Sequence, residues 1–493
     1  MKHPPTPQQS AYFSAGSDPR GGSIALDAKA GTGKTTTQQG LAKLLPGSGL
    51  ATSVLKSTVA DLAKVMPSNW ETKGLHSLGY AAIRKKLPRI KVDSSGNALY
   101  EFCKEKLSEE HEWWKLFAEI KSLVEQAMLA GIVPAHERFI TPDEPHEWEA
   151  LADRFDIEWS PIIYETARAA VTHLNNLALK GESLAFTHML TLPLFWSFPV
   201  QQYPKIIVDE AQDLNPLQHR MIAKALRHNG RVFITGDPNQ AIMAFSGADS
   251  DSFTNLVRQF KCRVLPLTWC WRCGSEIIRE AQQYVPSLEA PPGAHQGGVV
   301  QADHIDLDDL PRTVICRNNA PNLRLAMRLF TAGYTVECAG KDIGAGLKST
   351  TKRIASGKNA ASMPAADFLS RLQAWADREI RRRPARKHTV QDKRDALAAL
   401  AEHHTTLGDI TRHIDQLYQP EPDGMRRPAE FTLSTVHKAK GREWDRVGFL
   451  DAHLIPARWA KQDWELEQER NLAYVGVTRA KQELIYLDSD LIQ

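Results

Sequence analysis

Short apolar runs, rich in β-branched residues, recur along the chain between glycine, proline or polar residues. Such runs predict buried strands of parallel sheets. Two long stretches, from about residue 81 to 180 and from about 348 to 428, are instead rich in residues that favour helices. The expected strands are 24–26, 206–208, 232–235, 264–267, 313–316, 334–338, 431–435, 447–450 and 484–487.

Residues 28–35 follow the first apolar run and read Ala-Lys-Ala-Gly-Thr-Gly-Lys-Thr. The glycines let the backbone turn its N–H groups around phosphate oxygens, and the helix expected next points its positive end at the same anion. Lys34 can reach the β- and γ-phosphates, and Thr35 can bind Mg²⁺. The pattern predicts a phosphate-binding loop made of Ala30, Gly31, Thr32, Gly33, Lys34, Thr35 and Thr36.

An acidic pair, Asp209-Glu210, ends the apolar run at 206–208. Parallel sheets bind ligands at the carboxyl ends of their strands, which places this pair at the edge where the phosphate loop is expected. Asp209 can hold Mg²⁺, and Glu210 can orient or deprotonate the attacking water. The alternative is a solvated acidic turn, which suits Asp213 better than this pair.

Composition narrows the class of protein. The chain has 493 residues, of which 42% are hydrophobic and 24% charged, with a net charge of +3. Several domains are expected at this length, and a nucleic-acid surface must be a local patch. No apolar stretch approaches ~20 residues and the N-terminus has no apolar signal core, so no membrane partner is expected. Six cysteines in so long a chain do not form a disulfide scaffold, which favours the cytoplasm.

The positions of the motifs predict an α/β fold with two sheet cores. One helical stretch separates Lys34 from Asp209, and the other separates Arg272 from Glu443. Shorter steps of ~30 residues between the remaining candidates suit single βα units. The expected first core is 1–84 and 181–265 with a helical insert at 85–180, and the second core is 266–347 and 429–493 with a short helical insert at 348–428.

Eight segments resemble, in order, the motifs of superfamily 1 DNA helicases of the UvrD/Rep/PcrA type. They are TPQQ at 6–9, AKAGTGKT at 28–35, LHSLG at 75–79, VDEAQD at 208–213, GDPNQAI at 236–242, WR at 271–272, TVHKAKGREW at 435–444 and YVGVTRAK at 474–481. One segment alone would be weak evidence. The resemblance implies two RecA-like cores, ATP with Mg²⁺, and 3′-to-5′ movement on single-stranded DNA.

The resemblance also implies roles around the nucleotide. Gln9 resembles the glutamine that reads adenine, and Trp271 stands where the family stacks an aromatic ring on that base. Gln240 resembles a sensor of the γ-phosphate, and Glu443 a residue that contacts the ribose or the coordinated water. A polar N-terminal position is the alternative for Gln9, and a core position for Trp271.

Two arginines resemble the family's arginine fingers. Arg272 and Arg479 both belong to the expected second core, whereas the phosphate loop belongs to the first. A nucleotide between the cores would attract both guanidinium groups as charge develops on the γ-phosphate. A surface ion pair is the alternative for either arginine.

The expected path of single-stranded DNA is less well specified. Phe245 would stack under a base, although a core position is the alternative. The family's usual residues are replaced at Thr36, at Val54-Leu55, at Met243 and at Ser246. A basic run at 381–388 is either a solvated surface or a contact with duplex phosphates. The residues expected to contact DNA are His76, Ser77, Phe245, His437 and Lys438.

These observations favour an ATP-dependent DNA translocase and helicase that acts on single strands and on junctions with duplexes. It is expected to be monomeric or weakly associating, in the cytoplasm of a bacterial or phage-infected cell, near the nucleoid. The alternative is an ATP-gated module that binds DNA and remodels proteins with little unwinding. RNA as substrate, and protein partners in repair or replication, stay open.

Overall fold

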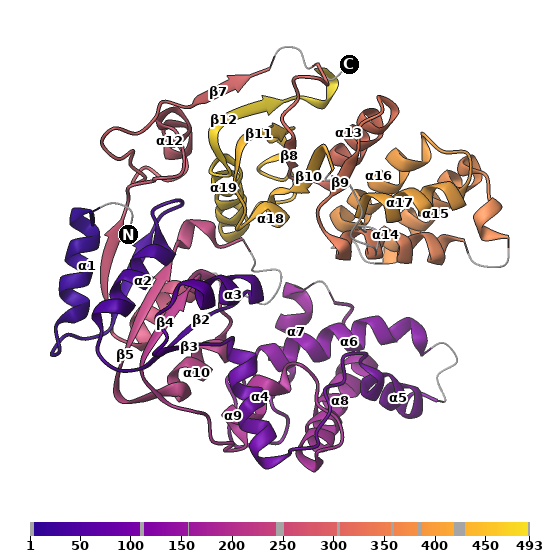
Figure 1. The fold of residues 1–493 in the computed structure, drawn as a ribbon. Coiled ribbons are helices and arrows are strands. Elements are labelled where there is room, and N and C mark those ends of the chain that lie inside the picture. Colours follow the sequence, from indigo (N-terminus) through magenta and orange to yellow (C-terminus); the bar gives the residue numbers. More distant parts are fainter. Residues whose placement is uncertain are drawn as a thin grey trace. The chain divides into compact units, whose positions relative to one another are not determined.

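The structure is a computed structural model that describes residues 4–108, 113–155, 157–242, 251–302, 306–355, 359–382, 387–418 and 429–491. The chain divides into two compact units, Met1–Thr268 and Trp269–Gln493, each with its own sheet (Figure 1). Among the described residues each sheet has six strands, and all strand pairs are parallel. The predicted α/β fold with two parallel-sheet cores is confirmed.

The first sheet has the strand order β3-β2-β4-β5-β1-β6. Its strands are β1 (Ile24–Ala28), β2 (Gly49–Ser53), β3 (Trp70–Thr72), β4 (Tyr203–Asp209), β5 (Leu226–Gly236) and β6 (Arg263–Leu267). β5 lies between β4 and β1, so the loops after these three strands leave the same carboxyl edge. β6 pairs with β1 along its length, so the run expected to lead into the second core completes the first sheet.

Successive side chains of a strand point to opposite faces of this sheet, and both faces are covered by helices. Ile206 and Val208 of β4 pack in one hydrophobic cluster, and Ile207 between them packs in another. The first cluster includes side chains of α4 and α10, and the second includes Tyr12 of α1 and Leu41 of α2. Burial on both faces explains why the strand has an unbroken apolar sequence.

The helices of the first unit fall into a group around the sheet and a separate group. The helices α5 to α8 surround a hydrophobic cluster of their own, which contains Trp148 and Val171. The bounds are α1 (Pro7–Ser17), α2 (Lys34–Leu44), α3 (Lys56–Val65), α4 (Leu75–Lys86), α5 (Asn97–Lys106), α6 (Trp114–Leu129), α7 (Pro145–Arg154), α8 (Pro161–Lys180), α9 (His188–Phe195), α10 (Pro216–Ala225) and α11 (Ser252–Gln259), with 3₁₀ turns η1 (Ala211–Asp213) and η2 (Pro238–Gln240).

The second sheet has the strand order β7-β12-β11-β8-β10-β9. Its strands are β7 (Gly298–Gln301), β8 (Thr313–Cys316), β9 (Val336–Cys338), β10 (Phe431–Thr435), β11 (Trp444–Leu450) and β12 (Ala480–Leu487). β7 was not among the expected strands. It lies at the edge of the sheet beside β12.

The helices of the second unit include four between β9 and β10. Phe368 of α15 and Leu400 of α16 share one hydrophobic cluster with Val314 and Phe431 of the sheet. This helical segment therefore shares one hydrophobic cluster with its sheet. The bounds are α12 (Ser275–Gln282), α13 (Asn319–Thr331), α14 (Lys341–Ile354), α15 (Ala365–Arg382), α16 (Lys387–Ala401), α17 (Leu407–Tyr418), α18 (Val436–Ala439) and α19 (Asp463–Val477), with 3₁₀ turns η4 (Ala360–Ser362), η6 (Ala452–Leu454) and η7 (Ser489–Leu491).

Across the described ranges, none of the helices combines the length and the apolar character needed to cross a bilayer.

Candidate nucleotide-binding site

The predicted phosphate loop joins β1 to α2 at the carboxyl edge of the first sheet. Gly31 and Gly33 have φ angles of 69° and 78°, in the left-handed region that favours glycine. Gly33 is the N-cap of α2, and the hydroxyl of Thr32 donates to the carbonyl of Lys29 at 2.8 Å. The loop is therefore a tight turn at a helix N-terminus, where backbone N–H groups can bind phosphate oxygens.

Lys34 and Thr35 begin α2 and point their polar atoms back toward the sheet. Lys34 Nζ donates to the carbonyl of Ala28 at 3.3 Å. The hydroxyl of Thr35 donates to Asp209 Oδ2 at 3.2 Å. Two oxygen ligands from elements far apart in sequence thus face each other. Hard oxygen donors of this kind fit Mg²⁺.

Asp209 is 1% exposed. Burial, followed by the neighbouring Glu210, raises the pKa of its carboxyl group from 3.8 to about 6. The charge of Lys34 and the hydrogen bonds from Glu210 N and Thr35 act in the opposite direction. Because the protein removes this carboxylate from water without a full counter-charge, a bound cation would stabilise it.

Glu210 occupies a strained corner directly after β4. Its φ angle is 52°, which is uncommon for a residue other than glycine. Its carboxylate accepts a hydrogen bond from Gln212 Nε2 at 2.6 Å. Gln212 Oε1 in turn accepts from the backbone N–H of Asp237, at 3.1 Å. Gln212 therefore connects the corner after β4 to the turn after β5, a role that the sequence did not indicate.

Gln240 lies in η2, the turn that follows β5. Gln240 Nε2 donates to Asp237 Oδ2 at 2.7 Å, and the backbone N–H of Asn239 donates to Asp237 Oδ1 at 3.2 Å. Asp237 is fully buried, and burial raises the pKa of its carboxyl group, against the charges of Lys34 and Lys29. The predicted γ-phosphate sensor is thus held by a buried carboxylate at the same sheet edge as the phosphate loop.

Gln9 lies in the first turn of α1, next to the phosphate loop. Its side-chain carbonyl accepts from the backbone N–H of Thr6 at 3.0 Å, and its amide donates to the hydroxyl of Thr37 at 2.9 Å. That hydroxyl donates to the carbonyl of Gly33 at 2.9 Å. Gln9 is therefore part of the cap of α1 and contacts α2. That it reads adenine stays a prediction.

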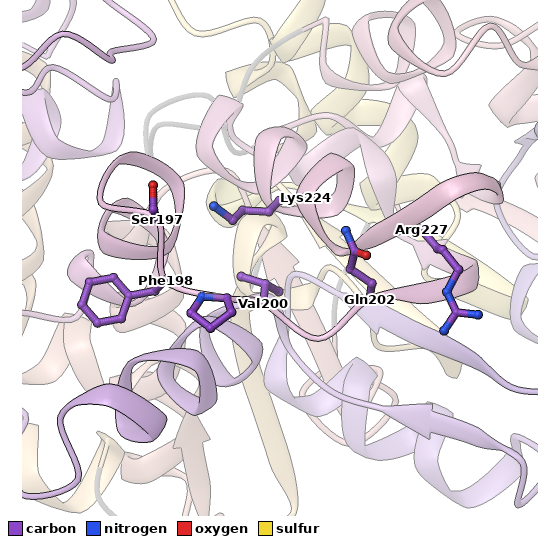
Figure 2. A pocket seen from close by; sticks show the side chains of 7 residues that line it. Ser197, Phe198, Val200, Gln202, Lys224 and Arg227 are labelled. Atoms are coloured by element: carbon purple, nitrogen blue, oxygen red, sulfur yellow. The ribbon is translucent and has the colours of Figure 1, made fainter.

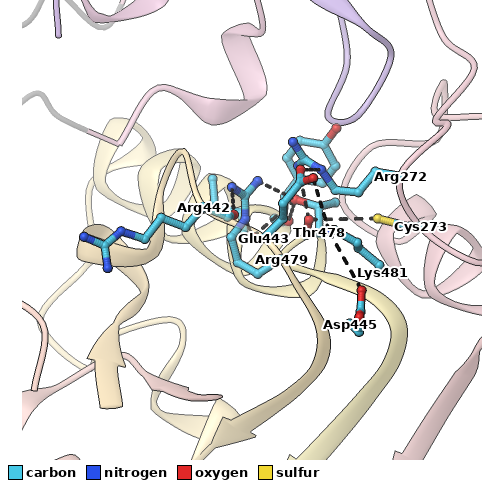
Figure 3. A network of polar contacts seen from close by, with 10 residues as sticks. Arg272, Cys273, Arg442, Glu443, Asp445, Thr478, Arg479 and Lys481 are labelled. Carbon is cyan, nitrogen blue, oxygen red and sulfur yellow. Dashed lines mark hydrogen bonds and ion pairs between the residues drawn. The ribbon is translucent and has the colours of Figure 1, made fainter. Parts of the chain in front are cut away.

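The second unit gathers Arg272, Glu443 and Arg479 in one polar network (Figure 3). Arg272 forms an ion pair with Glu443 and donates to the carbonyl of Thr478 at 3.3 Å. Lys481 Nζ lies 3.5 Å from the same Glu443 carboxylate. The two predicted arginine fingers are therefore neighbours within this unit.

Arg479 is almost completely buried, at 1% exposure. Its Nε donates to the carbonyl of Val475 at 2.8 Å, and one terminal nitrogen donates to the carbonyl of Arg442 at 2.9 Å. Burial, followed by Arg272, lowers the pKa of its guanidinium to about 10. The group therefore stays protonated near neutral pH. The alternative interpretation of Arg479 as a surface ion pair does not fit these contacts.

Trp271 is 49% exposed and lies edge-to-face with Trp269, with ring centroids 6.2 Å apart. A side chain exposed to this degree is not a core residue, which was the alternative interpretation. An exposed aromatic face next to Arg272 can take up a planar ligand. Stacking on adenine stays a prediction.

Two residues that are predicted to contact DNA, His76 and Ser77, lie in the first turn of helix α4. Ser77 is exposed, and the ring of His76 stacks on Phe186 with centroids 4.3 Å apart and planes inclined by 22°. Burial lowers the pKa of His76 to about 4, so this ring is neutral near pH 7. Phe186 is 60% exposed and lies just before α9. No motif indicated Phe186, which adds an aromatic surface beside the predicted path.

Two other residues that are predicted to contact DNA, His437 and Lys438, lie in α18. Lys438 is exposed and forms an ion pair with Asp342 at 2.8 Å. Burial, followed by nearby cations, lowers the pKa of His437 to about 3, which leaves it neutral. Phe245, with the replaced positions Met243 and Ser246, lies outside the described residues. Of the basic run, residues 383–386 lie outside them, and Arg381 is exposed.

A shallow pocket of about 540 Å³ lies at the opposite, amino-terminal edge of the first sheet (Figure 2). Its residues come from the segment before β4, the end of α10 and the start of β5. It has two basic side chains, Lys224 and Arg227, but none of the predicted site residues. This pocket is thus distinct from the predicted phosphate site.

Comparison with known protein families tests the resemblance that these motifs carry. Residues 10–261 match the UvrD/REP helicase N-terminal domain, and residues 380–488 match the UvrD-like helicase C-terminal domain. The first match alone covers half of the chain. The chain belongs to the UvrD/REP helicase family.

The similarity to individual members of the UvrD/REP family is distant. The F-box DNA helicase protein 1 of Schizosaccharomyces pombe is 25% identical over 94% of this chain and 55% of that protein. ATP-dependent DNA helicase UvrD2 of Mycobacterium tuberculosis is 23% identical over 57% of this chain and 46% of its own length. ATP-dependent DNA helicase PcrA of Bacillus subtilis is 46% identical over 14% of this chain and 10% of its own length. The chain spans about half the length of the first two relatives.

The predicted site residues of this UvrD/REP chain are distributed over both matched regions. The phosphate loop, Asp209, Glu210 and Gln240 fall within the N-terminal match, and Glu443 and Arg479 fall within the C-terminal match. Arg272 and Trp271 fall between the two.

Proposed function

We propose that this chain hydrolyses ATP to move along single-stranded DNA and to separate duplexes. The observation that supports it most directly is the contact between Thr35 of the phosphate loop and Asp209 at the end of β4, 3.2 Å long. It joins, at one sheet edge, the two motifs that are proposed to hold the triphosphate and its cation. Membership of the UvrD/REP family supports DNA as the track.

In the proposed reaction Lys34 leaves the carbonyl of Ala28 and binds the phosphates, which are also held by the N–H groups of residues 30–36. Thr35 and Asp209 would hold Mg²⁺, which neutralises charge on the phosphate oxygens when bound. Glu210 accepts a proton from the attacking water, and Gln240 contacts the γ-phosphate. Gln212 would hold Glu210 and Gln240 in fixed positions relative to each other, because it forms hydrogen bonds with both of the loops that carry them.

The second unit would complete the site. We propose that Arg272 and Arg479 reach the γ-phosphate, that Trp271 stacks on adenine read by Gln9, and that Glu443 contacts the ribose. The ion pair of Arg272 with Glu443 holds the finger in a defined orientation until nucleotide arrives. Nucleotide binding would then favour a closed arrangement of the units, and its loss an open one. Alternation between the closed and the open arrangement would drive the chain along DNA.

The proposed DNA path uses stacking more than charge. His76 and His437 are neutral near pH 7, so they contribute hydrogen bonds and ring surface but no salt-dependent attraction. Lys438 remains a cation for phosphates, and Ser77 a hydrogen-bonding group. Such a path is independent of base sequence, which suits translocation. The helical segments at 85–180 and 348–428 are proposed as inserted domains beside it.

A second candidate is an ATP-gated module that binds DNA and remodels proteins with little unwinding. The neutral state of the two histidines favours it, because neither of these predicted contacts adds an ionic attraction to DNA phosphates. The two functions separate in one assay. Partial duplexes with a 3′ or a 5′ single-stranded tail are incubated with the protein and ATP.

Strand release that depends on the 3′ tail supports the helicase and its 3′-to-5′ direction. Release only from the 5′-tailed duplex would contradict the direction. Hydrolysis that is stimulated by single strands without release of either duplex would favour the remodelling module. A protein without ATP hydrolysis in the presence of DNA and Mg²⁺ would contradict both functions.

A further inference from the structure

Lys29 is a buried cation that directly precedes the phosphate loop and lies five positions before Lys34 in the sequence. It is 6% exposed. Its Nζ lies 2.7 Å from Asp27 Oδ1 and 3.0 Å from Asn239 Oδ1, and its backbone N–H donates to the carbonyl of Leu267 at 3.0 Å. One ammonium group therefore connects the end of β1 to the turn η2, which carries Gln240.

The burial of this group needs a physical explanation. Lysine is seldom buried, because its ammonium loses the hydration that water provides. The Asp27 side chain beside it is 33% exposed, so the pair is not fully removed from water. A carboxylate and an amide oxygen replace the lost water around Lys29. The amide belongs to η2, so the position of that turn depends on the lysine.

The same turn is fixed from its other side by a buried carboxylate. Asp237 accepts the backbone N–H of Asn239 and the side-chain amide of Gln240. Asn239 thus lies between Lys29, which binds its side chain, and Asp237, which binds its backbone. The side chain of Gln240, the next residue, is oriented by the same Asp237.

We propose that Lys29 is a positioning residue that acts through Asn239 to hold Gln240 against the phosphate loop. This inference rests on the proposed function, because Gln240 matters only if the loop binds a triphosphate that is hydrolysed. Lys29 already has two partners within the protein, so its role is to fix η2 and not to bind nucleotide. Its loss is expected to slow hydrolysis while nucleotide binding is largely kept.

The test compares Lys29→Met, Asn239→Ala and the double variant in the full chain. Methionine keeps most of the length and removes the charge. Lys43→Met is the matched control, because Lys43 is an exposed lysine in the last turn of α2. Steady-state hydrolysis with saturating single-stranded DNA gives kcat, and a fluorescent ATP analogue gives the nucleotide Kd.

Lys29→Met is expected to lower kcat about tenfold and to change the Kd less than about threefold. The double variant is expected to lose little more than either single variant, because both remove one interaction. Lys43→Met is expected to behave as the unmodified protein. A Lys29→Met protein with lower thermal stability but unchanged kcat would overturn the inference.

Two further outcomes keep the test decisive. If Lys29→Met does not fold, Asn239→Ala decides alone, because it leaves the Lys29–Asp27 ion pair intact; unchanged kcat in Asn239→Ala would overturn the inference. Absence of hydrolysis in the unmodified protein would overturn the proposed function and this inference with it. Normal hydrolysis in that protein together with normal kcat in the variants would overturn the inference alone.

Discussion

Replacement of Asp209 by asparagine is expected to stabilise the nucleotide-free protein while it abolishes hydrolysis. Folding raises the pKa of this carboxyl group from 3.8 to about 6. The charged form is therefore disfavoured in the folded state. One pKa unit corresponds to about 1.4 kcal/mol, so the penalty at neutral pH is about 3 kcal/mol. Asparagine is neutral and retains an acceptor for the backbone N–H of Glu210.

The penalty depends on pH in a defined direction. Below pH 3.8 the group is protonated in both states and the penalty is absent. It grows between pH 3.8 and about 6, and it is complete above that range. The variant is therefore expected to gain stability at pH 7.5 and to lose this advantage as the pH falls toward 4.

Differential scanning calorimetry measures the effect in the full chain. A gain of about 3 kcal/mol corresponds to a rise of roughly 5–10 °C in the midpoint of the first unit. Asp61→Asn is the matched control, because Asp61 is an exposed carboxylate in an exposed ion pair with Lys64, and its removal should change stability by less than about 1 kcal/mol. ATP with Mg²⁺ should raise the midpoint of the unmodified protein more than that of the variant. An Asp209→Asn protein that melts no higher than the unmodified one at pH 7.5, or whose gain persists at pH 4, would refute the reasoning.

Three other predictions follow from named contacts. Lys34→Ala should abolish ATP hydrolysis at an unchanged melting temperature, and normal turnover would show that this loop is not the site. Arg479→Ala should keep nucleotide binding but lower single-turnover hydrolysis by about 10³; because Arg479 also donates to the carbonyls of Val475 and Arg442, circular dichroism must show an intact fold. Gly79→Ala should destabilise the first unit by about 1–3 kcal/mol or more, since the new Cβ would lie 1.7 Å from the carbonyl oxygen of Met189. Gly74→Ala, where nothing lies within 4 Å of the added Cβ, should have little effect in the same denaturation experiment.

The strands that the sequence predicted are those with a strong local signal. β4 and β8 contain β-branched runs because both faces of each sheet are covered. β2 was missed because its sequence, Gly-Leu-Ala-Thr-Ser, has no such run, although every one of its residues is buried. Its place in the sheet is set by its neighbours β3 and β4, which no local pattern reveals.

The candidate site residues could be predicted for a similar reason, because their motifs are short and continuous. The contacts that organise them were not found. Gln212 bonds two loops, and Lys29 bonds Asn239 across 210 positions of sequence. Such pairs meet only because the strand order places β1 next to β5 and β5 next to β4. The strand order, and not the type of each residue, therefore determines which of these side chains meet.

The corner after β4 has a counterpart in the other unit. Asp451 follows β11 with a φ angle of 50°, and a 3₁₀ turn, η6, comes next, as η1 follows Glu210. The Asp451 carboxylate accepts the backbone N–H of Ser489 at 2.8 Å and so anchors the C-terminal segment. The same backbone geometry thus occurs in two settings: in the first unit it carries the proposed base, Glu210, and in the second the acidic side chain of Asp451 holds the backbone of Ser489. Glycine in place of Glu210 would relax the backbone by about 1 kcal/mol and remove the proposed base, which is a reason for a protein to retain a strained residue there.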